Sequence, residues 1–375
     1  MTPAGAKPTS LPLLTEMRGV AALLIFHMHL GFYLPFLRVL SWGYLGVDFF
    51  FILSGYVLTH VYRDWFYPNF RPKSFRNFFW ARFGRVYPLY FFTCGLYLLL
   101  TGLLLSKWPV RGYLHEIFAL NFLPRWPGQN PVSWSIGSEG AAYIFAPFLI
   151  HWIRAEKPWR IGAALLFSAF ALYSVVFFRP GYQMLDVHTF SRCLPEFILG
   201  ICYYEICNRW RPGARLATAV GAGAFLCAIA SLLFVPVKAW RDLACVLSFS
   251  IVIPTATCLR GPFVRGFNLL FGYLGEISYS IYLVHPLLLL CFTRQIMPLV
   301  ARSGLSHTAA TALVYSLTTA LLILLSGLSY RYIELPARSF FKRATQRPAA
   351  NSTPAKAIPA DIVLAPAMDE SAPGR

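Results

Sequence analysis

The chain has 375 residues, of which 57% are hydrophobic and only 13% are charged. Soluble domains carry about 25% charged residues, so this composition excludes a protein whose whole surface faces water. The formal net charge is +18, but the lysines and arginines lie between long apolar runs, where such residues set membrane orientation. We therefore expect membrane lipid, and no nucleic acid, around this chain.

Several uncharged runs are long enough to cross a bilayer as helices. Residues 217–235, 243–259 and 309–329 contain no charged side chain. A run of roughly 17–25 such residues spans the hydrocarbon core, whereas a transmembrane β-barrel needs alternating segments of about ten residues. The sequence therefore predicts an all-α fold, a polytopic transmembrane bundle of about ten helices. The predicted spans are 14–34, 43–62, 86–106, 135–153, 161–178, 190–207, 217–235, 243–259, 273–292 and 309–333.

The remaining segments complete the predicted organisation. Segment 112–124 is apolar but short, so it is expected to lie at the membrane interface or to re-enter. Residues 1–13 form an N-terminal segment, 14–340 the transmembrane domain, and 341–375 a disordered tail rich in Ala and Pro.

The lysines and arginines between the spans predict the orientation. With this number of spans both termini share one side, and the loops on that side hold most of the loop Lys and Arg. Loop 63–85 contributes most to this bias, with Arg63, Arg71, Lys73, Arg76, Arg82 and Arg85. The positive-inside rule therefore places both termini in the cytoplasm.

Ionisable residues inside the spans are the candidates for function, because a charge in a membrane helix is costly and usually faces a partner or a watery cavity. The predicted orientation brings one set of them to a similar depth in the outer half of the bundle. These residues are His29, Asp48, Glu139, Arg192, Glu196 and His285. Two imidazoles among carboxylates suit proton transfer, since a carboxylate can orient an imidazole and stabilise its protonated form.

A structural alternative exists for the same set, in which ion pairs only hold helices together. Asp48 and Arg192 would make a suitable buried pair. His27 points about 200° away from His29 around a helix, so we expect it to pack rather than react. The eight cysteines show no metal-ligand spacing, so we expect no metal site.

The polar segments also resemble the motifs of a known family, the membrane acyltransferase-3 family of O-acyltransferases, which modify cell-surface sugars and related acceptors. An Arg, ten residues and a His in the first helix form its hallmark, matched here by Arg18 and His29. The resemblance covers about residues 10–340. Its other motifs are Gly46-Val-Asp48 with Ser54-Gly55-Tyr56, Arg82-Phe-Gly-Arg85-Val-Tyr87-Pro88, Trp134-Ser135 with Glu139, Arg192 with Pro195-Glu196, Ser278-Tyr279-Ser280 with Tyr282 and His285-Pro286, and Tyr332-Ile-Glu334-Leu-Pro336.

The resemblance implies a reaction and a location. The usual donor is acetyl-coenzyme A, which acts as a co-substrate from the cytoplasm, so no permanently bound cofactor is expected. The acceptor would be a hydroxyl of an extracytoplasmic or lipid-linked carbohydrate. We expect a bacterial cytoplasmic (inner) membrane protein in which 14–340 is the acyltransferase domain. Transfer would be completed without the extra esterase-like domain of some relatives, or with a partner protein.

The resemblance and the residue types together suggest roles. His29 is the candidate general base toward the acceptor hydroxyl, with Glu139 or Asp48 orienting it, and a transient acyl-histidine is the alternative. Arg18, Arg82 and Arg85 are the candidates for binding the donor phosphates, although Arg82 and Arg85 would also serve topology alone. The expected substrate-contacting or supporting residues are Ser54, Trp134, Ser135, Arg192, Glu196, Tyr282 and His285.

Two other functions fit parts of the sequence. A proton-coupled transporter or flippase also has ionisable residues near the membrane midplane, but paired helices interrupted by Gly or Pro in two halves are not evident here. An inert scaffold leaves the intramembrane polar residues unexplained. The sequence alone sets neither the acceptor nor the oligomeric state.

Overall fold

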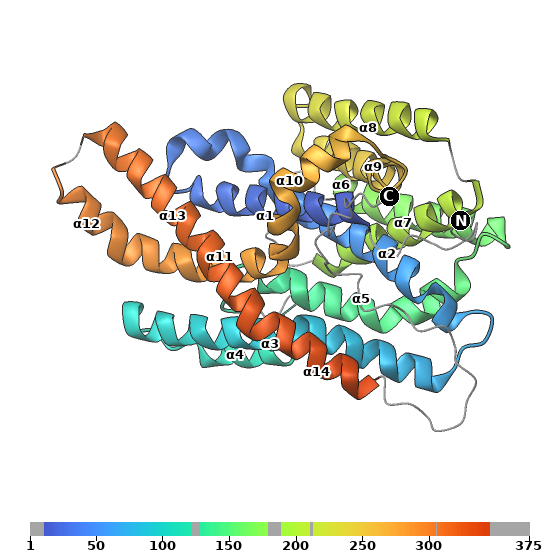
Figure 1. Ribbon diagram of the computed structural model, residues 1–375, viewed down its shortest axis with the longest axis horizontal. Coiled ribbons are helices and arrows are strands. Elements are labelled where there is room, and N and C mark those ends of the chain that lie inside the picture. Colours follow the sequence, from blue (N-terminus) through green and yellow to red (C-terminus); the bar gives the residue numbers. More distant parts are fainter. Residues whose placement is uncertain are drawn as a thin grey trace, which may run out of the picture.

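The computed structural model describes residues 11–121, 123, 128–178, 189–210, 213–304 and 306–345. Within these ranges all regular structure is helical and no strand is present. The elements in chain order are α1 (Pro12–Leu30), η1 (Pro35–Tyr44), α2 (Leu45–Phe66), α3 (Pro72–Leu105), α4 (Val110–Ile117), α5 (Ser133–Trp152), α6 (Pro158–Phe178), α7 (Thr189–Trp210), α8 (Ala214–Phe234), α9 (Lys238–Ala256), α10 (Pro262–Glu276), α11 (Ser278–Cys291), η2 (Phe292–Ile296), α12 (Met297–Ala301), α13 (His307–Ser329), η3 (Tyr330–Glu334) and α14 (Leu335–Thr345) (Figure 1).

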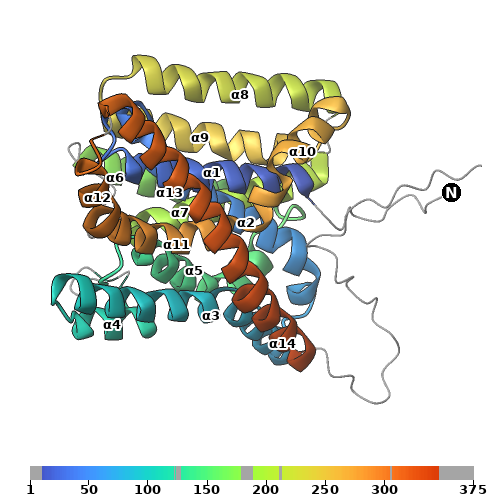
Figure 2. The same cartoon turned by 60° about the vertical axis from the view of Figure 1, so that its left-hand side comes forward.

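The long helices form a layered bundle. Helix α8 lies at one edge against α9, and α3 with α4 lies at the opposite edge (Figures 1 and 2). Helices α13, η3 and α14 are continuous and cross the bundle obliquely to reach α3 (Figure 2). Helices α1, α2, α5, α7 and α11 pack between these layers, and they carry the buried Asp48, Glu196 and His285.

Most predicted spans coincide with helices that can cross a membrane. In the part of the chain that the structure describes, 8 helices are long and apolar enough to do so. The predicted spans 135–153 and 190–207 correspond to α5 and α7, which have 20 and 22 residues. These two helices are less apolar because they carry polar residues of the candidate site. The prediction of an all-α polytopic bundle is confirmed.

The structure corrects several predicted boundaries. Loop 63–85 is mostly helix, because α2 extends to Phe66 and α3 begins at Pro72. The predicted loop 260–272 is largely α10, and the predicted span 273–292 is divided between α10 and α11. The start of α3 carries several Lys and Arg side chains, and α10 has only 15 residues, so a search for long apolar runs does not detect them. Residues 341–345 of the predicted tail belong to α14, whereas residues 1–10 and 346–375 lie outside the described residues.

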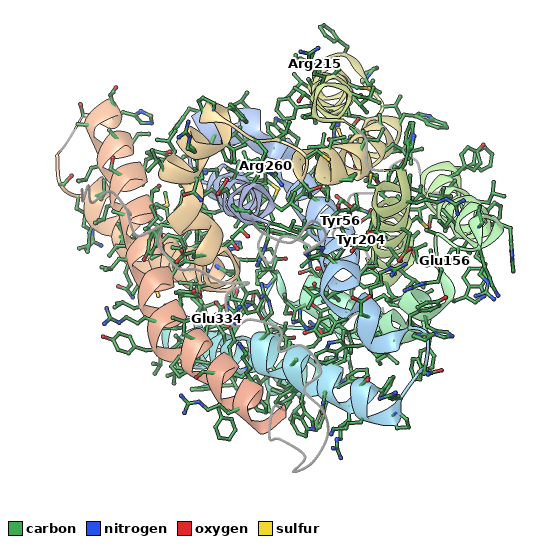
Figure 3. The ribbon with its side chains drawn as sticks, turned by 45° about the vertical axis from the view of Figure 1, so that its right-hand side comes forward. Tyr56, Glu156, Tyr204, Arg215, Arg260 and Glu334 are labelled. Carbon is green, nitrogen blue, oxygen red and sulfur yellow. The ribbon has the colours of Figure 1, made fainter. Side chains whose placement is uncertain are left out.

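Helices α2 and α7 approach each other closely through two glycines. A Cβ added at Gly55 would overlap the backbone at Phe197, and one added at Gly200 would meet the backbone nitrogen of Tyr56 at 2.7 Å. The rings of Tyr56 and Tyr204 pack edge to face at 5.3 Å further along this contact (Figure 3). Larger side chains at the two glycines would push α2 and α7 apart. The charged residues that form ion pairs between these two helices would then be separated.

The three central polar helices run in the same direction. Near the start of α2 and α7, Asp48 pairs with Arg192, and near their ends Arg63 Nε lies 2.7 Å from Glu205 Oε1. Helix α5 follows α2 in the same sense, since His151 Nδ1 donates to the carbonyl of Phe66 at 2.8 Å. This common direction is the one that the predicted order of spans requires.

Candidate functional site

Two histidines from α1 and α11 face each other in the interior. The ring centroids of His29 and His285 are 5.1 Å apart, and the side chain of His285 is fully buried. His29 Nδ1 lies 2.8 Å from the carbonyl of Ile25, and His285 Nδ1 lies 3.3 Å from that of Ile281. A carbonyl can only accept a hydrogen bond, so Nδ1 carries the proton in both rings. The Nε2 atom of each therefore holds a free lone pair, which is the form that a general base needs.

His27 has a different environment on the other side of α1. Its Nδ1 donates to the carbonyl of Leu23 at 2.8 Å, and its Nε2 accepts from the hydroxyl of Tyr315 at 3.2 Å. Both ring nitrogens are therefore engaged within the protein. The expectation that His27 packs while His29 is available agrees with these contacts.

A buried ion group joins α2 to α7. Asp48 forms an ion pair with Arg192, and Arg192 Nε lies 3.4 Å from Glu196 Oε1. Both carboxylates are fully buried. Arg192 is shared by the two buried carboxyl groups, and removing the arginine would leave both of them without their cation in a medium of low dielectric. The pairing of Asp48 with Arg192 is the structural alternative that the sequence suggested.

Glu139 forms a separate polar group on α5. Its Oε1 accepts hydrogen bonds from Ser54 Oγ on α2 and, at 2.7 Å, from the hydroxyl of Tyr143. Neither Glu139 nor Asp48 contacts His29 in the described part of the chain. The predicted orientation of His29 by a carboxylate is therefore not seen, because each carboxylate is engaged elsewhere. The carbonyl of Ile25 orients the imidazole instead.

Tyr282 connects the histidine pair to α5. Its ring centroid lies 5.8 Å from that of His285, and its hydroxyl oxygen lies 2.6 Å from Ser135 Oγ. The same hydroxyl donates to the carbonyl of Val132 at 3.2 Å. Trp134, next to Ser135, packs edge to face on Phe51 at 6.4 Å. The start of α5 is thus fixed beside the two imidazoles.

A buried carboxylate on α4, which sequence analysis did not single out, fixes the segment that leads into α5. Glu116 is fully buried, and its Oε1 accepts from the backbone nitrogen of Asn130 at 2.6 Å and from Ser133 Oγ at 2.8 Å. Burial raises the pKa of Glu116, although its hydrogen bonds oppose this effect. The short helix α4 therefore acts as a support for the polar start of α5.

An arginine group lies at the end of the bundle where α1 begins. Arg82 Nη2 on α3 donates to the hydroxyl of Tyr62 at 2.7 Å. Arg18 on α1 lies within electrostatic range of Arg85 on α3 and of Glu139. Among the described residues, neither Arg18 nor Arg85 forms a hydrogen bond or ion pair. Guanidinium groups brought together in excess over the carboxylates near them form a site of positive potential that favours an anion.

Comparison with known proteins decides the family. The acyltransferase-3 family profile, described as an acyltransferase domain, matches residues 14–331. The chain belongs to this family. It is a multi-pass membrane acyltransferase. No solved structure matches the chain.

Three relatives of this acyltransferase show how far the similarity extends. The acyltransferase MdmB of Streptomyces mycarofaciens is 27% identical over 91% of this chain and 95% of its own length. The exopolysaccharide production protein ExoZ of Rhizobium meliloti (strain 1021) is 28% identical over 65% of this chain and 75% of its own. Protein 2 in the picA locus of Rhizobium radiobacter is 46% identical over 22% of this chain, which covers 41% of that protein.

The candidate residues of the acyltransferase thus fall into distinct groups. The structure brings together His29 with His285 and Tyr282, Asp48 with Arg192 and Glu196, Glu139 with Ser54, and Arg18 with Arg85. Three residues of these groups were not predicted from the sequence: Tyr143 and Tyr62, which bond Glu139 and Arg82, and Glu116. Tyrosines and short polar helices are common in membrane bundles, so nothing in their local sequence marks these residues.

Proposed function

We propose that this acyltransferase is an O-acetyltransferase of the bacterial cytoplasmic membrane. Acetyl-coenzyme A is its donor, and a hydroxyl of an extracytoplasmic or lipid-linked carbohydrate is its acceptor. The observation that carries the proposal is that the family-matched domain contains both the imidazole of His29, whose Nε2 holds a free lone pair, and a group of arginines of which Arg18 and Arg85 form no ion pair among the described residues. The relative ExoZ is named an exopolysaccharide production protein, and this name supports a glycan acceptor.

In the proposed reaction His29 acts on the acceptor hydroxyl. Its Nε2 removes the hydroxyl proton while the oxygen attacks the thioester carbonyl, the carbon–sulfur bond breaks, and the proton passes to the leaving thiolate of coenzyme A. In the alternative route Nε2 attacks the thioester carbonyl and forms an acyl-histidine as the coenzyme A thiolate leaves. The hydroxyl oxygen then takes the acyl group from Nε2, and the hydroxyl proton passes to the thiolate. Both routes need the neutral tautomer that the carbonyl of Ile25 selects.

The arginines supply the proposed donor site. Coenzyme A carries several phosphate charges, and a guanidinium can bind a phosphate through two parallel hydrogen bonds. Arg82 is held by Tyr62, while Arg18 and Arg85 form no ion pair or hydrogen bond among the described residues. If these arginines only set the orientation of the chain in the membrane, they would not need to face the interior of the bundle.

Mass spectrometry of surface glycans tests the proposed function. Cells that produce this chain should carry acetyl groups on a surface or lipid-linked glycan that are lost when the chain is deleted and restored by the wild-type gene. An unchanged acetylation pattern across all glycans would contradict the carbohydrate acceptor. Accumulation of an unmodified glycan on the cytoplasmic side would instead favour a flippase.

The proposed orientation places both termini in the cytoplasm. The bias of lysine and arginine toward one side of the membrane is the physical reason, and α3 carries much of this charge outside its apolar half. A reporter active only outside the cytoplasm, fused after Arg375, should therefore remain silent. A cytoplasmic reporter at the same site should be active, and the reverse result would contradict the topology.

A further inference from the structure

Arg338 lies on α14, beyond the end of the family match at residue 331. Its Nη1 donates to Glu334 Oε1 at 3.3 Å, and Glu334 Oε2 accepts from Ser280 Oγ of α11 at 3.1 Å. Only 2% of the Glu334 side chain and 18% of the Arg338 side chain are exposed. Glu334 lies on the side of the long C-terminal helix that faces the bundle (Figure 3).

The packing of α14 directs Arg338 toward α3. Phe341 stacks on Trp80 with ring centroids 5.7 Å apart, and a Cβ added at Gly84 would overlap the ring of Phe341. Residues three apart lie on the same face of a helix, so Arg338 lies on the face of α14 that contacts α3. It is within electrostatic range of both Arg82 and Arg85.

The cluster then has more positive than negative charge. Four guanidinium groups come together from three separate helices, and the carboxylates in electrostatic range of Arg18 are Glu334 and Glu139. Like charges at short range in a medium of low dielectric repel strongly. An anion with several negative charges would relieve the repulsion among the four guanidinium groups. Glu334 accepts a hydrogen bond from Nη1 of Arg338 and so occupies only part of that guanidinium group.

We propose that Arg338 is a fourth arginine of the donor site and binds a phosphate group of the coenzyme A nucleotide. The inference rests on the proposed function, because it assigns a residue to the same donor site. It also gives α14 a role, which is to close the arginine cluster against α3. A purely structural role, in which Arg338 only neutralises Glu334, is the competing explanation.

The test measures coenzyme A binding by calorimetry with the purified full-length protein. Arg338→Ala should raise the Kd for coenzyme A about tenfold or more, as expected for a lost charge-assisted contact. Arg343→Ala, an exposed arginine on the same helix, is the matched control and should leave Kd unchanged. Equal Kd values for the two variants would overturn the inference, whereas a wild-type protein that does not bind coenzyme A would overturn the proposed donor as well.

The effect of Glu334→Gln on the Kd for coenzyme A distinguishes a phosphate-binding role of Arg338 from a purely structural one. If Arg338 binds phosphate, freeing it from Glu334 should leave Kd unchanged or lower. If the pair is only structural, Glu334→Gln should weaken binding and lower the unfolding temperature as much as Arg338→Ala does, which would overturn the inference. Arg338→Lys serves if the alanine variant does not fold. A raised Kd at an unchanged unfolding temperature supports the inference, and an unchanged Kd contradicts it.

Discussion

His29→Ala should abolish acyl transfer while the protein is still produced and inserted. A sugar hydroxyl is a poor nucleophile at neutral pH and needs its proton removed as the acyl carbon is attacked, and histidine has a suitable pKa range for that work. A positioned general base contributes about 10²–10⁴-fold to the rate, so activity should fall by at least that factor. The measurement is acetyl transfer at matched amounts of folded wild-type and variant protein.

His27→Ala is the natural control for His29. The two residues share a helix, a residue type and a similar depth, but both nitrogens of His27 are engaged by Leu23 and Tyr315. Its loss should therefore change the rate little compared with the loss of His29. A His29→Ala enzyme that keeps more than about a tenth of the wild-type rate, well above the range for a lost base, would remove His29 from the mechanism.

Replacing Arg82 and Arg85 together by alanine should raise the Michaelis constant for the acyl donor. Both side chains are partly buried on α3 and lie near Arg338 in the proposed donor site. A charge-assisted contact is worth about 1.5–3 kcal/mol, so losing two should raise the constant by at least about tenfold. The measurement is donor-dependent kinetics of the purified variant, together with its unfolding temperature.

The matched control removes the same number of charges from the same helix. Lys73 and Arg76 are exposed near the start of α3, so Lys73→Ala with Arg76→Ala should leave the Michaelis constant unchanged. If basic charge on α3 serves topology alone, both double variants should behave alike. If the double variant of Arg82 and Arg85 has an unchanged Michaelis constant for the acyl donor, these two residues serve membrane topology alone.

Much of the architecture could be predicted, because the length of an apolar run shows whether a helix can cross the hydrocarbon core of a bilayer. Most of the spans and the common direction of α2, α5 and α7 follow from hydropathy and charge, and the pairing of Asp48 with Arg192 is one of the two alternatives that the sequence offers. The helical nature of residues 72–85 was missed, because a helix that leaves the membrane becomes polar while its backbone bonds continue. Hydropathy detects only its apolar part.

The sequence proposed the residues of a candidate site, but it did not predict their contacts. Depth along a helix can be estimated from residue numbers, so His29 and His285 were expected at one level. Rotation and packing decide which side chains meet, and these depend on close approaches such as Gly55 against Phe197. For that reason the carboxylate expected beside His29 is replaced by the carbonyl of Ile25. The sequence alone could not rank these partners.

The most direct test of the acyltransferase proposal is label transfer in vesicles that contain this chain as the only added protein. With acetyl-coenzyme A labelled in the acetyl group, wild-type protein should place label on a glycan acceptor as an ester that mild base releases. The His29→Ala protein should not. If neither protein transfers label to any acceptor while wild-type vesicles move solute in response to a proton gradient, the chain would act as a carrier and the proposed O-acetyltransferase mechanism would be contradicted.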